Sequence, residues 1–189
     1  MRLLKKKCRI CKGSFFKTKS LTLKNMPSAA QNFPEITKLK NDKGINLNIS
    51  QCSKCGVVQT TNRPVNYYRE VIRAPSFSPE MIKFRTVQFK KIIQRYKLRG
   101  KKIIEVGSGY GEYLSLLNNF ELKAFGLENS NKAIKISKKK NLNVSKGYID
   151  KVNYRLYKNP FDAFFIFSYL EHLPNINIVL RALFKNLTN

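Results

Sequence analysis

The sequence has no long hydrophobic run. No uninterrupted apolar stretch approaches the roughly 18 residues that a membrane-spanning helix needs, and polar residues interrupt even the most apolar segment, 163–173. The first eight residues include one Arg and three Lys, but the apolar core of a secretory signal peptide does not follow them. We therefore expect no membrane span and a cytoplasmic protein.

Acidic residues are also scarce. The chain carries 11 Asp and Glu against 37 Lys and Arg, which gives a formal net charge of +26. Such an excess favours an anionic partner, namely nucleic acid, an anionic membrane surface or a phosphorylated substrate. However, the basic residues are spread along the whole chain and do not form one concentrated arm. The charge therefore leaves nucleic acid possible without favouring it.

What is present is enough for a packed core, because 42% of the 189 residues are hydrophobic and 12% are aromatic. We expect a small domain in residues 1–62, a linker and helix in 63–100, and a larger domain in 101–189. The small domain is expected to contain strands at 45–49 and 57–61, and a helix should run from Ser78 to near Gly100. Strands are then predicted at 102–106, 122–127, 144–149 and 161–167, alternating with helices at 112–118, 131–140 and 175–187. This alternation predicts an α/β fold with a parallel sheet covered on both faces.

The four cysteines form two Cys-x-x-Cys pairs, and none follows residue 55; they are Cys8, Cys11, Cys52 and Cys55. Each pair can form a tight knuckle that points both sulfurs at one centre, and two knuckles supply the four thiolates of a tetrahedral Zn²⁺ site. Gly13 and Gly56 follow the two pairs, and we expect both to adopt the left-handed backbone of such a turn.

Two alternatives to zinc are weaker. Disulfides would suit a secreted protein, and a redox Cys-x-x-Cys would not need a second pair. About 60 residues also bury too little surface to be stable alone, whereas structural zinc contributes on the order of 10 kcal/mol. We therefore expect a structural zinc ion, whose four thiolates leave no open position for catalysis.

A glycine-rich segment, Glu105-Val-Gly107-Ser-Gly109-Tyr-Gly111-Glu112, follows one predicted strand and opens a helix. Its third glycine comes one residue earlier than in the dinucleotide fingerprint, which argues against NAD. The segment resembles the glycine-rich motif of class I S-adenosylmethionine-dependent methyltransferases. This resemblance implies that S-adenosylmethionine is the cofactor and that Glu105, Gly107, Gly109 and Gly111 contribute to its site.

The next two strand ends carry acidic residues. Glu128 lies 23 residues after Glu105 at the end of the second strand, where a carboxylate can accept hydrogen bonds from both ribose hydroxyls. Asp150 follows the third strand, where the family contacts the adenine. An ordinary turn with a surface glutamate is the simpler alternative, but the order of the three strand ends favours cofactor binding.

The fourth strand is followed by Tyr169, Glu171 and His172, which is the only histidine in the chain. A histidine just beyond a strand's carboxyl end can act as a general base whose pKa its neighbours set. The alternative is a packed histidine that only shapes the pocket.

Together these motifs resemble the zinc-binding sugar methyltransferases, in which a four-cysteine zinc domain precedes the methyltransferase domain. The best-known members C-methylate nucleotide-linked keto-deoxysugars. Residues 26–33 and 52–59 are similar to the family's segment between the knuckles and to its second knuckle. Tyr169, Glu171 and His172 are similar to its substrate-side residues, with the histidine as proposed base. The resemblance implies a sugar or sugar-nucleotide substrate used in surface polysaccharide synthesis.

Only four of the seven strands of the class I fold are predicted, so we expect an incomplete methyltransferase domain in a C-terminally truncated chain. Two rival functions remain: a zinc-ribbon RNA methyltransferase, which the charge favours, and a non-catalytic fragment. The fourth strand ends in Ser-Tyr-Leu-Glu and not in the Asn/Asp-Pro-Pro-Tyr of base-amino methyltransferases, and no cysteine is left over for a cytosine-C5 enzyme. The sequence does not predict the sugar, O- or C-methylation, or the oligomeric state.

Overall fold

A computed structural model describes residues 7–17, 21–29, 34–65 and 77–188 of the chain. The chain divides into two compact units, Met1–Val71 and Ile72–Asn189. Residues 30–33 of the segment that resembles the sugar methyltransferases, and 66–76 of the predicted linker, lie outside the described residues. No helix in the described ranges is long and apolar enough to cross a membrane.

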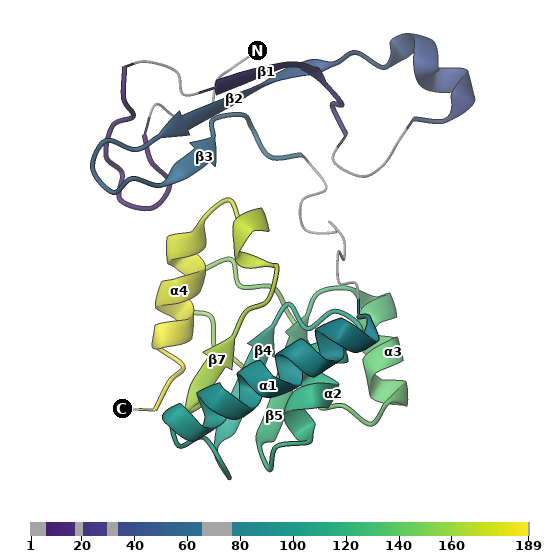
Figure 1. The fold of residues 1–189 in the computed structure, drawn as a ribbon, viewed down its shortest axis with the longest axis vertical. Helices are drawn as coiled ribbons and strands as arrows, with labels where there is room; N and C mark the ends of the chain where they lie inside the picture. Colours follow the sequence, from purple (N-terminus) through teal and green to yellow (C-terminus); the bar gives the residue numbers. More distant parts are fainter. Residues whose placement is uncertain (1–6, 18–20, 30–33, 66–76, 189) are drawn as a thin grey trace. The chain divides into compact units, whose positions relative to one another are not determined.

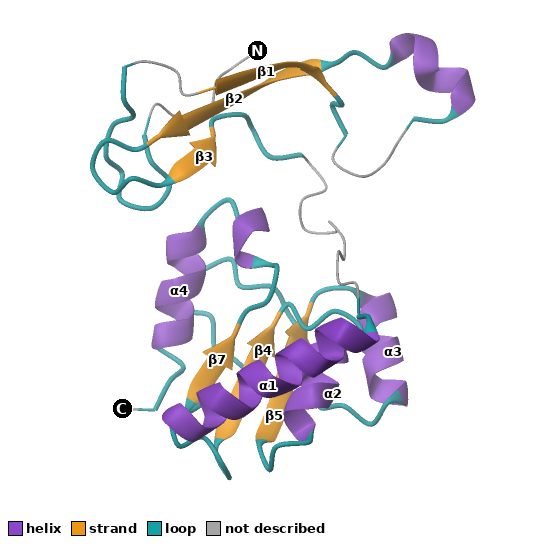
Figure 2. Ribbon diagram, in the orientation of Figure 1, coloured by secondary structure: helices purple, strands orange, loops and turns teal. Residues whose placement is uncertain are grey.

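The N-terminal unit contains a three-stranded antiparallel sheet in the order β1-β2-β3, formed by Leu21–Met26, Ile45–Gln51 and Val58–Thr60 (Figure 2). Strands β2 and β3 match the predicted ones, whereas β1 and the short 3-10 helix η1 (Ile36–Asn41) were not predicted. Leu23 of β1 pairs with Leu47, and the register then shifts before Met26, where Asn25 has a φ of +52°. This irregularity keeps the regular part of β1 short.

Each cysteine knuckle is closed by a backbone hydrogen bond of its own. The Cys8 N–H donates to the Gly13 carbonyl at 2.8 Å, and the Cys52 N–H donates to the Val57 carbonyl at 2.9 Å. An isolated antiparallel bridge between Phe15 and Cys52 joins the end of the first knuckle to the start of the second. Cys11 and Cys52, which are 41 positions apart in the sequence, are thereby brought together.

The C-terminal unit contains four parallel strands in the order β6-β5-β4-β7: Val144–Lys146, Lys123–Glu128, Lys102–Val106 and Ala163–Phe165 (Figure 2). The predicted α/β fold is confirmed. Strand β7 is shorter than predicted because Phe161 is bonded elsewhere: its N–H donates to Asn186, and its carbonyl accepts from Thr188. Strand order reverses at β4, which has β5 on one side and β7 on the other, and ligands of open α/β sheets bind at such a point.

Four α-helices pack on this sheet (Figure 1): α1, α2, α3 and α4, formed by Pro79–Arg95, Glu112–Asn118, Asn131–Lys139 and Ile176–Phe184. Ser78 caps α1 by accepting a hydrogen bond from the Met81 N–H at 3.2 Å. Helix α1 ends before the predicted Gly100 because Lys97 adopts a left-handed φ of +52°. This turn folds Leu98 back into the core.

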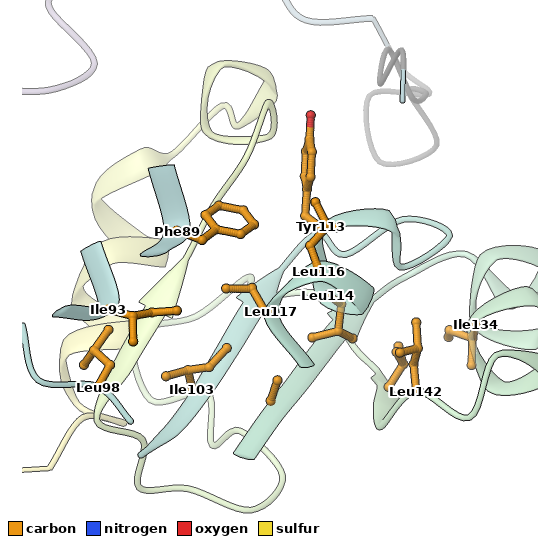
Figure 3. Close-up of a cluster of buried hydrophobic side chains, with 12 residues drawn as sticks. Phe89, Ile93, Leu98, Ile103, Tyr113, Leu114, Leu116, Leu117, Ile134 and Leu142 are labelled. Atoms are coloured by element: carbon orange, nitrogen blue, oxygen red, sulfur yellow. The ribbon is translucent and has the colours of Figure 1, made fainter. Parts of the chain in front are cut away.

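Side chains on β4 alternate between two hydrophobic clusters, one on each face of the sheet. Ile103 packs with residues of α1 and α2, including Phe89 and Leu117 (Figure 3), whereas Ile104 packs in the cluster that contains residues of α4. The sheet is therefore covered on both faces, as predicted. By the same alternation Glu105 points to the face that carries Ile103, where it is almost completely buried.

Candidate active site and metal centre

The candidate active-site residues gather at one edge of the parallel sheet. Gly107 follows β4, Glu128 ends β5, Asp150 comes after β6, and Tyr169 comes after β7. Because all four strands run in the same direction, their carboxyl ends meet at this edge. The loop after β4 therefore lies between the ends of β5 and β7.

The glycines of this loop have different surroundings. All three have left-handed backbone, with φ values of +77° at Gly107, +56° at Gly109 and +76° at Gly111. A Cβ at Gly111 would collide with Leu142, so this glycine allows α2 to start close to the segment after α3. A Cβ at Gly109 would meet no atom nearer than 3.9 Å. Gly109 is thus where a ligand can approach the loop backbone.

Glu128 joins the end of β5 to the glycine loop. Its Oε2 atom accepts a hydrogen bond from the Gly109 N–H at 2.8 Å, while Oε1 accepts from the Asn129 and Ser130 N–H groups, each at 2.8 Å. A carboxylate has about four acceptor positions. Oε2 therefore retains capacity for one further donor beside the open part of the loop.

Glu105 is buried beneath the loop, with 2% of its surface exposed. Burial raises the pKa of its carboxyl well above the usual value, and the charges of Glu112 and Glu128 add to this effect, which the Leu114 N–H only partly offsets. Its Oε2 and the Ser108 hydroxyl are buried without a hydrogen-bond partner. Unsatisfied buried polar atoms are rare and often mark functional sites. Sequence reasoning overlooked Ser108, because nothing distinguishes a serine between two glycines.

Tyr169 lies against the same loop. A Cβ at Gly107 would be only 2.7 Å from Cγ of Tyr169, so the tyrosine ring covers the glycine directly. The preceding residue, Ser168, has a left-handed φ of +47°, which is strained for a serine and reverses the chain after β7. This reversal places Tyr169 beside the predicted cofactor loop.

Glu171 and His172 are exposed on the short 3-10 helix η2 (Leu170–His172). The backbone N–H of His172 donates to the Tyr169 carbonyl at 3.1 Å. Among the described residues, neither the imidazole nor the Glu171 carboxylate has a hydrogen-bond or ion-pair partner. The catalytic roles of Tyr169, Glu171 and His172 stay predictions, as does the exposed Asp150 as a contact for the adenine.

The four cysteine sulfurs form a cluster in which all Sγ atoms lie within 4.8 Å of one another. Cys8 and Cys55 are 3.7 Å apart, and Cys11 and Cys52 are 3.5 Å apart. Zn–S bonds of about 2.3 Å in a tetrahedron imply sulfur separations of about 3.8 Å. The cluster therefore fits a tetrahedral zinc ion, and the sequence predicted its four members.

Backbone groups and neighbouring thiols shift the acidity of the cluster. The N–H groups of Cys55 and Lys54 outweigh burial and lower the pKa of Cys52 to about 6. The Val57 N–H lowers the pKa of Cys55, but hydrogen bonds with other sulfurs, above all Cys11, and burial raise it to about 12. A metal ion bound here at neutral pH must therefore displace a proton from Cys55.

The residue with left-handed backbone is a glycine in only one of the two knuckles. Gly56, directly after Cys55, has the predicted left-handed backbone with a φ of +73°. In the first knuckle the prediction for Gly13 was wrong, because the left-handed residue is Lys12, with a φ of +61°. Gly13 has a steric role instead: a Cβ there would lie 2.8 Å from Cβ of Lys54, so its absence lets the knuckles approach.

A family model described as "Methyltransferase domain" matches residues 97–189, just under half of the chain. No curated protein matches the sequence.

Three methyltransferases are among the solved structures that this chain matches. An amino pentose methyltransferase from Micromonospora echinaspora has 15% identity and a TM-score of 0.46, covering 62% of this chain and 55% of its own. A sugar N-methyltransferase from Streptoalloteichus has 15% identity, a TM-score of 0.48, and coverages of 62% and 53%. An S-adenosylmethionine-dependent methyltransferase from Clostridium acetobutylicum has 11% identity and a TM-score of 0.49. The match covers 57% of this chain and 47% of that structure. This chain thus spans about half the length of these structures.

Proposed function

We propose that the protein is an S-adenosylmethionine-dependent methyltransferase that acts on a sugar. The observation that carries this proposal is the hydrogen bond between the Gly109 N–H and Glu128, which joins the glycine loop to the end of β5. The same edge holds an acceptor position on Glu128, an open approach at Gly109 and unsatisfied polar atoms beneath the loop. The match of residues 97–189 to a methyltransferase domain supports it independently.

The cofactor would lie across the ends of β4 and β5. When bound, S-adenosylmethionine supplies a methyl group made electrophilic by a positively charged sulfur. Glu128 would accept a hydrogen bond from the ribose through Oε2, and Gly109 would admit the ligand to the loop. The ring of Tyr169 would cover Gly107 and exclude water from the methionine end. Asp150 would bound the adenine side.

The acceptor would bind beyond β7, near His172. Methyl transfer to a hydroxyl or an activated carbon requires loss of a proton from the acceptor, and an exposed imidazole can take it. The resemblance of Tyr169, Glu171 and His172 to the zinc-binding sugar methyltransferases supports a nucleotide-linked sugar used in polysaccharide synthesis. The basic surface would favour the pyrophosphate of such a substrate.

The N-terminal unit would hold a structural zinc ion through Cys8, Cys11, Cys52 and Cys55. The sulfur separations fit tetrahedral coordination, and four thiolates leave no position for a substrate. When bound, zinc cross-links the two knuckles. The chain's own contribution is the arrangement of N–H groups, of which those of Ile10, Gly13 and Lys54 each point at a sulfur 3.4 Å away.

The cofactor proposal is tested by calorimetric titration of S-adenosylhomocysteine into the full chain and its Glu128→Gln variant. The variant retains the shape of the carboxylate but presents an N–H to Gly109 or to the ligand, so we expect binding to weaken at least tenfold. Glu121→Gln, at an exposed glutamate, is the matched control and should bind like the wild type. A folded wild-type chain that does not bind contradicts the proposal.

The acceptor proposal is tested by methyl transfer to a panel of nucleotide-linked sugars. We expect His172→Gln to abolish turnover while S-adenosylhomocysteine binds unchanged, because the imidazole acts on the acceptor alone. Equal turnover by the variant would exclude His172 as the base.

The net charge of +26 favours RNA as an alternative acceptor. If RNA binds, its affinity should fall steeply with salt, with a slope that reports several phosphate contacts. Weak binding with a shallow slope would exclude this second candidate.

A further inference from the structure

Arg85 of α1 is a half-buried cation placed between the glycine loop and the end of β7. Its Cζ lies 5.1 Å from the centroid of the Tyr113 ring and 5.2 Å from that of Phe167. Tyr113 is the second residue of α2, directly after the glycine loop, and Phe167 comes two residues before Tyr169. In Figure 3 the Tyr113 hydroxyl points away from the hydrophobic cluster. The aromatic pair therefore holds the guanidinium beside the candidate active site.

The charge of Arg85 is not neutralised by the described residues. One nitrogen, Nη1, donates to the neutral amide oxygen of Gln88 at 2.6 Å, and no described carboxylate forms an ion pair with the guanidinium. Nε is buried without a hydrogen-bond partner. Aromatic faces attract a cation but do not neutralise its charge. Within the described ranges, no residue therefore supplies an anion to the guanidinium.

The position of Arg85 indicates which part of a ligand it would meet. On the proposed function, on which this inference rests, Glu128 at the β5 end of the loop faces the ribose. Through Phe167, Arg85 lies against the opposite, β7 side, where the methionine end of the cofactor and the acceptor would be found. Both can carry a negative group, a carboxylate in the cofactor or a phosphate in a nucleotide-linked acceptor.

We propose that Arg85 is an anion-recognition residue of the active site and binds a carboxylate or phosphate group of the ligand. The contacts with the two rings restrain the guanidinium, whose planar set of N–H donors matches two oxygens of one anion. A lysine would retain the charge but would lose the planar set of N–H donors.

The test compares Arg85→Gln and Arg85→Lys in the full chain with Lys90→Gln, which removes an exposed cation from the same helix. Three probes are titrated: S-adenosylhomocysteine, 5′-methylthioadenosine, which lacks the methionine carboxylate, and inorganic pyrophosphate added to the chain saturated with S-adenosylhomocysteine. Thermal unfolding confirms that each variant is folded.

If Arg85 binds the cofactor carboxylate, Arg85→Gln lowers the affinity for S-adenosylhomocysteine roughly tenfold to hundredfold and leaves the affinity for 5′-methylthioadenosine unchanged. If it binds an acceptor phosphate, only pyrophosphate is weakened by that factor. In both cases Arg85→Lys recovers only part of the affinity. If folded Arg85→Gln binds all three probes as Lys90→Gln does, the inference is overturned. A wild-type chain that binds neither nucleoside contradicts the proposed function and leaves the inference on Arg85 to a second comparison. In that case the pyrophosphate affinities of the cofactor-free wild type, Arg85→Gln and Lys90→Gln decide whether Arg85 binds an anion.

Discussion

The two units of this chain bury very different amounts of apolar surface. In the described N-terminal residues the fully buried apolar side chains are those of Cys8 and Cys52, while all others in the described chain lie in the C-terminal unit. Several large N-terminal side chains, such as Ile36 and Val58, are instead exposed. Hydrophobic burial can hold the C-terminal unit together, whereas the N-terminal unit needs another source of stability.

The sulfur cluster is the candidate for that source, because its buried members are also candidate metal ligands. In the C-terminal unit the core and the functional residues are separate sets: Ile103 and Ile104 pack on the two faces, while Glu128 and Tyr169 lie beyond the strand ends. One unit thus combines its core with its candidate ligand site, whereas the other keeps the two apart.

The largest effect is expected from a zinc ligand. Cys52→Ser removes one of four thiolates at a fully buried position, and structural zinc contributes on the order of 10 kcal/mol to folding. We expect the N-terminal unit to unfold and the zinc content, measured by mass spectrometry of the native chain, to fall to near zero. Ser53→Ala, at the exposed neighbour, is the control. Retention of one zinc ion per chain in Cys52→Ser would show that the cluster is not the site.

A smaller effect is expected from core truncation. Leu117→Ala removes a side chain with no exposed surface and should destabilise the C-terminal unit by about 2–5 kcal/mol. Leu21→Ala, at a residue that is 48% exposed, should cost the N-terminal unit less than about 1 kcal/mol. Hydrogen exchange resolved by region measures both. Equal losses would show that the two units do not differ in how they are held together.

Alanine substitutions at two glycines distinguish the cost of backbone strain from the cost of a steric clash at the candidate site. Gly100 and Gly107 have φ values of +71° and +77°, so alanine at either should cost about 1–2 kcal/mol in backbone strain. Only at Gly107 does the new Cβ meet another residue, the ring of Tyr169. Urea unfolding should show a larger loss for Gly107→Ala, and calorimetry should show weaker S-adenosylhomocysteine binding for this variant alone. Equal losses of stability and equal binding in the two variants would show that the Tyr169 ring does not contact Gly107.

The smallest effect concerns pH. Burial raises the pKa of Glu105, so its contribution to stability is fully present below the unfolded value of 4.5 and is lost as pH rises through the folded pKa. We expect the wild type to lose stability relative to Glu105→Gln as pH increases above about 5, which urea unfolding at several pH values measures. A wild type that gains stability over this range would mean that the carboxylate is ionised and paired.

The sequence predicted the features that follow from periodicity and from residue type. The strand and helix alternation after Lys101, the four cysteines and the placement of Glu128 were all predicted from the sequence. Strand β1 was not predicted, because its alternation is short and its pairing with β2 depends on residues distant in the sequence. The short β7 likewise depends on the pairing of Phe161 with the end of the chain.

Contacts across elements could not be predicted either. Nothing in a serine between two glycines reveals that Ser108 is buried, and nothing in α1 reveals that Arg85 lies against Tyr113 and Phe167. The turn at Lys12 shows the same limit, since lysine carries no preference for a left-handed backbone. Such features arise from packing between segments, which a single sequence does not encode locally.

One measurement tests the account most directly: hydrogen exchange of the zinc-loaded full chain, with and without a chelator and with and without S-adenosylhomocysteine. We predict that the chelator accelerates exchange only in residues 7–65 and that the nucleoside slows it around 105–112 and 126–130. Unchanged exchange in the N-terminal unit after zinc removal would contradict the metal-dependent half of the account. Unchanged exchange at the glycine loop in a folded chain would contradict the proposed cofactor site.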